Sequence, residues 1–179
     1  MEYRNCKISI GEAGGTAARG SKTYKTSLPS SWIKAMGLDE NNKDVEISFD
    51  GKRITIEKYT TTEEFISEKI KLNHTIEKIS FFNNTTLCTV IYADFTDRTL
   101  RAKNFTDNII KTAFGNNKSP KWEDFQNFLF ERCIPKERAG IREYLEAIDV
   151  SEYNPIEIIK RTAGRMAEDA QWIRMETIR

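Results

Sequence analysis

The sequence predicts an α+β protein with a mostly β N-terminal part, a small β-rich unit and a mainly helical C-terminal part. Short alternating runs separated by Gly and Pro fill residues 1–59. Residues 76–105 are dominated by Val, Ile, Tyr, Thr and Phe, which favour strands. Residues 106–175 carry apolar residues at helical spacing. We therefore divide the chain into an N-terminal domain, residues 1–59, and an α+β domain, residues 60–179.

The N-terminal domain begins with two predicted strands. Cys6, Ile8 and Ile10 alternate with polar residues, which is typical of a half-buried strand. Residues 11–21 are rich in glycine and form the predicted loop, and residues 23–28 form the second strand.

A short helix and a hairpin complete this domain. Pro29 is expected to end the second strand, because it has no N–H to donate, and Ser30 is placed to cap a helix that Gly37 ends. Alternating apolar residues then predict a hairpin over residues 45–56, with Asp50-Gly51 as its tight turn. A domain this small, with so few large apolar side chains, would have a marginal core alone. Two chains that interleave their hairpins would pair the strand edges and close one barrel, so we expect a homodimer.

These residues resemble a known family. Residues 25–38 read Lys-Thr-Ser-Leu-Pro-Ser-Ser-Trp-Ile-Lys-Ala-Met-Gly-Leu, and residues 45–51 and 54–58 read Val-Glu-Ile-Ser-Phe-Asp-Gly and Ile-Thr-Ile-Glu-Lys. In this order they are similar to the AbrB/MazE/SpoVT family of swapped-hairpin DNA-binding domains, over about residues 5–58. The resemblance implies a dimeric swapped-hairpin β-barrel that binds double-stranded DNA with basic residues of its first hairpin loop and adjoining strands. In this sequence those DNA-binding positions are Arg19, Lys22, Lys25, Lys7 and Arg4.

Charge supports the same interpretation. The formal net charge is only +1, but Lys and Arg outnumber Asp and Glu in residues 1–36. Arg19 has the planar fork that pairs with guanine, whereas Lys22 and Lys25 act as point charges on phosphate. The alternative is a mobile loop with solvated charges. A nucleotide-binding loop is not expected, because Ser21 interrupts the G-x-x-x-x-G-K-[ST] pattern and a strand is predicted to follow.

The second domain is predicted to change from strands to helices. A short helix is expected from Thr62, and strands over residues 87–92 and 99–105. The helices beyond are expected to begin at Thr106, Ser119-Pro120, Pro135 and Asn154-Pro155, and the first of them to end at Gly115.

Residues 124–138 and 162–173 resemble a helical domain of bacterial mobile-element proteins, which implies no mechanism. These segments could recognise a protein or RNA; the alternative is a set of solvated helix faces with weak ion pairs. The candidate partner-binding residues are Arg132, Arg138, Arg165, Asp169 and Trp172.

Catalytic, metal and cofactor sites are not predicted. His74 is the single histidine and is expected at the surface or in a cap, and the three cysteines are expected to be buried apolar residues. Glu168 and Asp169 would diverge on a helix, which makes a shared metal ion or an acid/base pair awkward. Neither a membrane-spanning run nor a secretion signal is apparent, so a cytoplasmic setting is expected.

The sequence therefore predicts a dimeric DNA-binding transcriptional regulator with a C-terminal partner-binding or sensing domain. The alternative is an antitoxin-like or anti-defence inhibitor, of the anti-CRISPR type. It would bind a protein or ribonucleoprotein partner through residues 60–179 and regulate its own promoter through the N-terminal domain. An enzyme such as a nuclease is the least favoured class.

Overall fold

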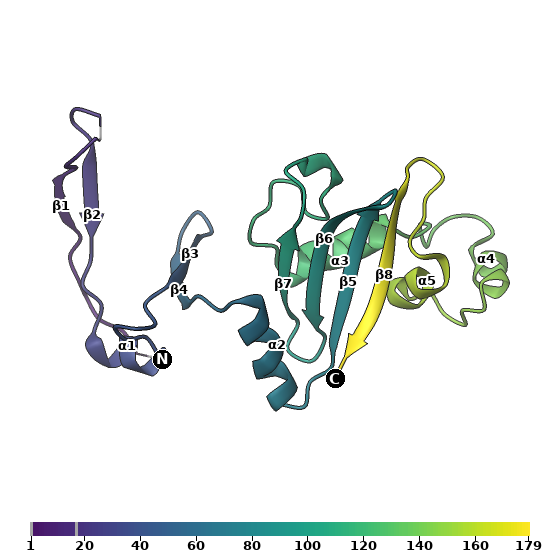
Figure 1. Cartoon of the computed structure of the whole chain (residues 1–179), viewed down its shortest axis with the longest axis horizontal. Coiled ribbons are helices and arrows are strands. Elements are labelled where there is room, and N and C mark those ends of the chain that lie inside the picture. The colour runs from purple at the N-terminus through teal and green to yellow at the C-terminus, as the bar shows by residue number, and fades with distance from the viewer. Residues whose placement is uncertain (1, 17) are drawn as a thin grey trace. The chain divides into compact units, whose positions relative to one another are not determined.

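The computed structural model describes residues 2–16 and 18–179 (Figure 1). The chain divides into two compact units, Met1–Tyr59 and Thr60–Arg179, which we call unit 1 and unit 2. Helices and strands occur in both units, so the predicted α+β class is confirmed.

Within residues 2–16 and 18–59, unit 1 consists of two antiparallel hairpins and one short helix. β1 pairs with β2 and β3 pairs with β4, so the predicted order of elements is confirmed. In chain order the elements are β1 (Ser9–Glu12), β2 (Lys22–Lys25), α1 (Ser30–Ala35), β3 (Val45–Phe49) and β4 (Ile54–Lys58).

Four local predictions for unit 1 are wrong. β1 begins at Ser9 and not at Cys6, and it includes Gly11 and Glu12, which were predicted in the loop. β2 ends at Lys25 and does not extend to Leu28. The residue that caps α1 is Pro29, whose backbone is still extended at ψ 133°, and not Ser30, which is already helical. The turn between β3 and β4 is wider than two residues, because the Asp50 carboxylate accepts hydrogen bonds from the N–H groups of Lys52 and Arg53 at 2.8 Å each.

Both hairpins of unit 1 expose apolar side chains that alternate along the strands. Ile10 lies opposite Tyr24, and they are 62% and 66% exposed. Ile47, Phe49 and Ile54 share one face of the second hairpin and are 63%, 68% and 68% exposed. The described residues of one chain form no closed barrel. The described residues of unit 1 therefore do not cover its own apolar faces.

Unit 2, all of whose residues are described, is built on an antiparallel sheet of four strands in the order β7-β6-β5-β8. β5 pairs with β6 on one side and with β8 on the other, from Ile76 opposite Ile178 to Asn83 opposite Gln171. The elements are α2 (Thr62–Lys71), β5 (Ile76–Asn83), β6 (Thr86–Asp94), β7 (Thr99–Asn104), the 3₁₀ turn η1 (Ile109–Lys111), α3 (Trp122–Glu131), α4 (Ile141–Ala147), α5 (Pro155–Thr162) and β8 (Gln171–Ile178).

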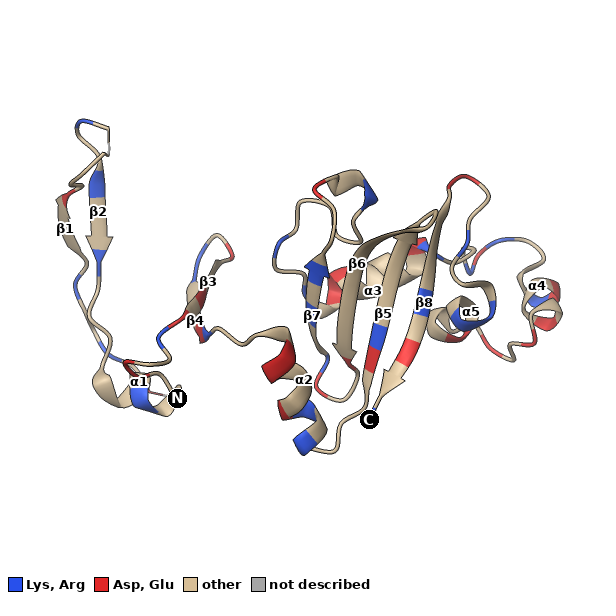
Figure 2. Cartoon of the chain, viewed as in Figure 1, with Lys and Arg blue, Asp and Glu red and all other residues tan. Residues whose placement is uncertain are grey.

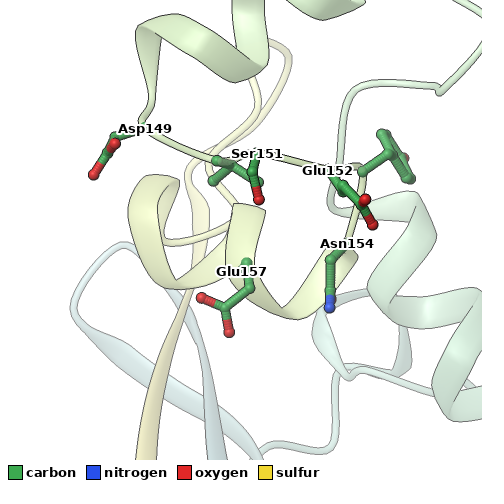
Figure 3. Close-up of a pocket in the computed structure, with 7 residues that line it drawn as sticks. Asp149, Ser151, Glu152, Asn154 and Glu157 are labelled. Carbon is green, nitrogen blue, oxygen red and sulfur yellow. The ribbon is translucent and has the colours of Figure 1, made fainter.

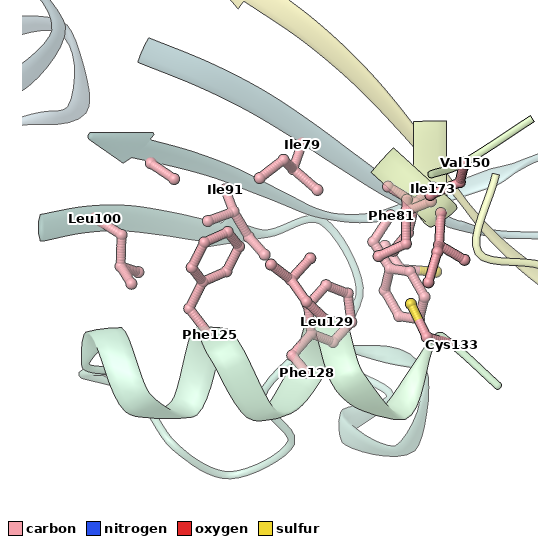
Figure 4. Close-up of a cluster of buried hydrophobic side chains, with 14 of the residues drawn as sticks. Ile79, Phe81, Ile91, Leu100, Phe125, Phe128, Leu129, Cys133, Val150 and Ile173 are labelled. Atoms are coloured by element: carbon pink, nitrogen blue, oxygen red, sulfur yellow. The ribbon is translucent and has the colours of Figure 1, made fainter. Parts of the chain in front are cut away.

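The main core lies between α3 and α5 and one face of this sheet (Figure 4). Phe125 is fully buried, and Phe128 meets the Phe81 ring edge to face at 5.2 Å. The predicted apolar face of α3 is thereby confirmed. Cys133 lies in the same core, where burial raises the pKa of its thiol to about 11. Cys88 is also buried, but Cys6 is exposed, so the expectation that it is buried is wrong.

The other face of the sheet is covered at one end by α2. Thr61 and Glu64 form a capping box at the start of this helix. Phe65, the buried residue of α2, lies under the Arg101 guanidinium of β7 at 5.7 Å. Alternation along β7 places Arg101 on the face opposite Leu100, which belongs to the main core. The rest of this second face is left without a helix.

The predicted helical region, residues 106–175, needs three corrections. The helix expected from Thr106 to Gly115 is reduced to η1, because the Asn108 side chain caps Ile110 N–H and Thr112 bonds back to Ile109. The helix expected from Pro135 begins only at Ile141, after a turn.

The largest error concerns the C-terminal end of that region. Residues 171–178 form β8, because Ala163 and Gly164, with φ 55° and 57°, end α5 and turn the chain back to the open edge of β5. The helix predicted to start at Asn154-Pro155 is confirmed as α5.

Candidate nucleic-acid interface

The predicted DNA-binding residues are all exposed. Lys22 and Lys25 are the first and last residues of β2, Arg19 lies in the loop before β2, and Arg4 and Lys7 precede β1. Alternation along β2 places Lys22 and Lys25 on opposite faces of the hairpin. Lys22 lies on the same face as Ile10 and Tyr24 and opposite Glu12. The structure therefore does not bring all five cations onto one surface of a single chain.

The loop between β1 and β2 closes through its backbone. Ala13 N–H donates to Ser21 O at 2.8 Å, and Ser21 N–H donates to Ala18 O at 3.0 Å. Gly20 has φ 89°, a conformation that other residues rarely adopt. A strand follows the loop, so it lacks the helix N-terminus of a nucleotide-binding loop.

Two of the predicted partner-binding residues, Arg132 and Asp169, bind each other within unit 2. Arg132 is 7% exposed, and its guanidinium donates to Gly164 O at 2.8 Å and to both carboxylate oxygens of Asp169 at 2.6 and 3.1 Å. It also donates to the side chain and carbonyl of Gln171. This network ties the segment before β8 to the end of α3. Arg132 lowers the pKa of Asp169, which keeps the carboxylate charged.

The other predicted partner-binding residues lie elsewhere. Trp172 stacks on Phe82 with ring centroids 4.3 Å apart, and its Nε1–H donates to Asn84 O at 2.7 Å. The Arg165 guanidinium lies over the Trp172 ring at 5.3 Å. Arg138 is exposed in the segment before α4. The sequence prediction missed Phe82, because the contact depends on the pairing of β5 with β8.

His74, which was expected at the surface or in a cap, donates its N–H to Lys69 O at the end of α2, and its partly buried side chain takes part in a cluster with charged residues. Its Nδ1 lies 2.8 Å from the Asp94 carboxylate, which is fully buried. The Lys69 ammonium lies 3.5 Å from Asp94 and 2.6 Å from Asp97. Asp94 also accepts hydrogen bonds from the N–H groups of Thr96 and Asp97. The cluster thus fastens the end of α2 to the turn between β6 and β7.

The charges of this cluster support one another. Burial raises the pKa of Asp94, but the hydrogen bond with His74 and those from backbone N–H groups outweigh burial and lower it. Burial likewise lowers the pKa of Lys69, but its contacts with Asp97 and Asp94 raise it overall. His74, Asp94 and Asp97 lie close enough together to hold a metal ion. Since the Lys69 ammonium already contacts both carboxylates and holds them between α2 and the turn after β6, we assign the cluster to structure.

A shallow acidic pocket of about 320 Å³ lies beside α5 (Figure 3). Asn154 caps α5 by accepting from Ile156 N–H, and Asp149 pairs with Arg161 at 3.0 Å. The residues that line the pocket are Asp149, Val150, Ser151, Glu152, Tyr153, Asn154 and Glu157. Solvated carboxylates of this kind do not define a catalytic arrangement.

No protein-family model, curated protein or solved structure matches this chain. The resemblance to the AbrB/MazE/SpoVT family therefore stays a prediction. In the part of the chain that the structure describes, every helix is too short or too polar to cross a bilayer.

The Arg132 network predicts a stability effect. Arg132→Met should destabilise unit 2 by about 2–4 kcal/mol, because it leaves Gly164 O and the Asp169 carboxylate without their donor. Urea unfolding at pH 7 measures this. Arg138→Met, at an exposed position, should change the free energy of unfolding by less than about 0.5 kcal/mol. Equal effects of the two substitutions would contradict the structural role of Arg132.

The Asp94 cluster predicts a pH dependence. Because the folded-state pKa of Asp94 is below its ordinary value of 3.8, its stabilisation is present above pH 4 and is lost as the pH falls through the folded value. Asp94→Asn should cost about 2–3 kcal/mol at pH 7, and the difference from wild type should shrink below pH 4. The control is Asp97→Asn, at a 44% exposed side chain, which should cost less than about 1 kcal/mol. A pH-independent difference would contradict this account.

Proposed function

We propose that the protein is a dimeric DNA-binding regulator of the AbrB type, in which unit 1 binds duplex DNA. The proposal rests on what the two hairpins of unit 1 expose. Their apolar faces are exposed, and cationic residues lie along the loop and strands of the first hairpin (Figure 2).

The apolar faces support the dimer. Ile47, Phe49 and Ile54 place three large side chains on one face of a two-stranded hairpin, and an isolated hairpin of this kind is at best marginally stable in water. Burying each of them would contribute about 1.5–3 kcal/mol. A second copy offers an identical apolar face and pairs the free strand edges at the same time. A dimer would therefore both bury the apolar face of unit 1 and pair its free strand edges.

The cations support duplex DNA as the ligand. Lys25 shares the face of the first hairpin that bears Ser9 and Thr23, opposite the apolar face of Ile10 and Tyr24. In a dimer that buries the apolar face, Lys25 would stay accessible for phosphate. The loop presents Arg19 beside exposed glycines, whose backbone approaches phosphates closely. We assign base contact to Arg19 and phosphate contact mainly to Lys25, with Lys22, Lys7 and Arg4 adding positive charge.

Unit 2 would then act as the partner-binding or sensing part. Phe105, Ile109 and Ile110 are exposed within a short segment at the end of the sheet, which favours the second candidate function, inhibition of a partner through unit 2. The DNA assay below separates the regulator from a protein that acts only through a partner, because such a protein would show no salt-dependent affinity for duplex DNA. An inhibitor that also represses its own promoter would bind duplex DNA and would in addition capture its partner through residues 60–179.

The dimer is tested by charge on the apolar face. Phe49→Asp should shift the molar mass in solution from two chains to one, because the carboxylate would be desolvated in the interface. Light scattering after size exclusion measures the mass. Ser48→Asp, on the opposite face of the same strand, should leave the dimer intact. A wild-type protein that is monomeric at micromolar concentration would contradict the proposal.

DNA binding is tested by removing one arginine. Arg19→Ala should weaken binding to a preferred duplex by about 1–3 kcal/mol and relax sequence choice. Affinity of the wild type should fall steeply with salt. Arg53→Ala removes the same charge from the loop of the second hairpin and should change affinity by less than about twofold. Fluorescence anisotropy against a library of duplexes measures both, and equal loss in the two variants would remove Arg19 from the site.

A further inference from the structure

The helix-free part of the second sheet face in unit 2 combines aromatic rings with cations. The register places Phe82 of β5 beside Trp172 of β8, with their rings parallel within 8°. The Arg165 guanidinium lies over the Trp172 ring, and the Arg174 guanidinium lies over the Phe82 ring at 5.6 Å. Two stacked rings are thus flanked by two planar cations.

The same face continues across the sheet. Ser80 lies opposite Arg174 on β8 and opposite Val90 on β6, and Val90 lies opposite Lys103 on β7. Lys103 is exposed and lies over the Phe105 ring at 5.6 Å. Lys78 adds a further cation on β5, as the Lys and Arg segments on β5, β7 and β8 in Figure 2 show. Ser80 and Val90, which the register places between Arg174 and Lys103, are buried.

Negative charge on this part of the face is limited to Glu176 among the described strand residues. Its carboxylate lies 3.6 Å from Lys78 and 3.7 Å from Arg174. These side chains are between 33% and 54% exposed, so water screens the ion pairs and a phosphate can replace the carboxylate. The face outside α2 therefore has a surplus of positive charge around an aromatic pair.

We propose that this sheet face, formed by Lys78, Phe82, Lys103, Arg165, Trp172 and Arg174, binds single-stranded nucleic acid. Each ring has one face against the other ring and lies under a guanidinium on its other side, so the rings hold the Arg165 and Arg174 planes in place. Unpaired bases stack on such guanidinium planes, and neighbouring lysines and arginines neutralise the phosphates. An open antiparallel sheet offers these groups on one surface at strand spacing. Charge complementarity favours a polyanion over an apolar peptide. The site does not depend on duplex binding by unit 1.

The test uses the full-length protein and a labelled mixed-sequence oligonucleotide of about 20 nucleotides, as RNA, as single-stranded DNA and as duplex DNA. Arg165→Ala with Arg174→Ala should weaken binding of the single strand on the order of tenfold or more, and should leave duplex binding unchanged. The matched control is Lys160→Ala with Arg161→Ala, which removes two exposed cations from α5 on the other side of the sheet. It should change single-strand affinity by less than about twofold.

The rings are tested separately from the charges. Phe82→Leu should weaken single-strand binding by about tenfold, while Phe82→Tyr keeps a stacking ring and should bind as the wild type does. Glu176→Gln should strengthen binding, because it removes the carboxylate that competes for Lys78 and Arg174. Circular dichroism melts confirm that each variant is folded, and binding of either RNA or single-stranded DNA supports the proposal.

Three outcomes would overturn it. The first is an equal loss of single-strand affinity in the sheet-face double variant and in the α5 double variant, which would show that any surface cation attracts the oligonucleotide. The second is wild-type affinity in a folded Phe82→Leu variant. The third is the absence of single-strand binding at 50 mM salt, which would leave the face to a protein partner with acidic groups.

Discussion

The pairing of β8 with β5 is the interaction on which the structure of unit 2 depends. Without it, β5 would be an edge strand, and Ile79 and Phe81 would lack their neighbours Met175 and Ile173 on the core face. The pairing joins the end of the chain to residues near its middle, and such a non-local contact carries a high entropic cost of loop closure. The Arg132 network offsets part of this cost, because it fixes Gly164 and Asp169 just before the strand begins. The same pairing brings Trp172 beside Phe82, so the second sheet face exists only when the core face is complete.

Units 1 and 2 solve the burial of apolar surface in different ways. Unit 2 layers α3 and α5 on its sheet and buries Phe125, Ile158 and Ile159 almost completely. Unit 1 has a single buried apolar residue, Leu38, among its described residues, and leaves its strands uncovered. Alternating Ile and Phe side chains on exposed strands fit a stable fold only if another surface covers them. This difference is the physical reason for placing assembly in unit 1 and not in unit 2.

Local signals were enough for much of the fold. Asn154-Pro155 marks the start of α5 because the Asn154 side chain caps the helix and Pro suits its first turn. The apolar spacing of Phe125, Phe128 and Leu129 similarly identifies the buried face of α3.

Predictions were wrong where a distant segment decides the local conformation. Residues 171–178 alternate as a strand does, but they form a strand only because they pair with the free edge of β5. This edge is distant in the sequence, since Trp172 and its hydrogen-bond partner Asn84 are 88 residues apart. The His74–Asp94 contact and the cations Lys78, Lys103 and Arg174 of the second sheet face were missed for the same reason, since contacts between distant segments cannot be read from spacing along the chain. Arg165 and Trp172 were among the predicted partner-binding residues, but their place beside Phe82 was not foreseen. The exposed cations of unit 1, by contrast, follow from composition alone.

The two proposed nucleic-acid surfaces differ in what they can recognise. In a duplex the base faces are stacked on one another, so rings such as Phe82 and Trp172 would gain nothing from it beyond the attraction of neighbouring cations for phosphate. The first hairpin of unit 1 has the opposite limitation, because its loop over residues 13–22 contains cations, glycines and small side chains, and Tyr24 lies on the apolar face that the proposed dimer would bury. Its guanidinium and ammonium groups suit phosphates and the groove edges of paired bases. Ligand choice by each surface therefore follows from whether aromatic rings stand among its cations, and not from the amount of positive charge.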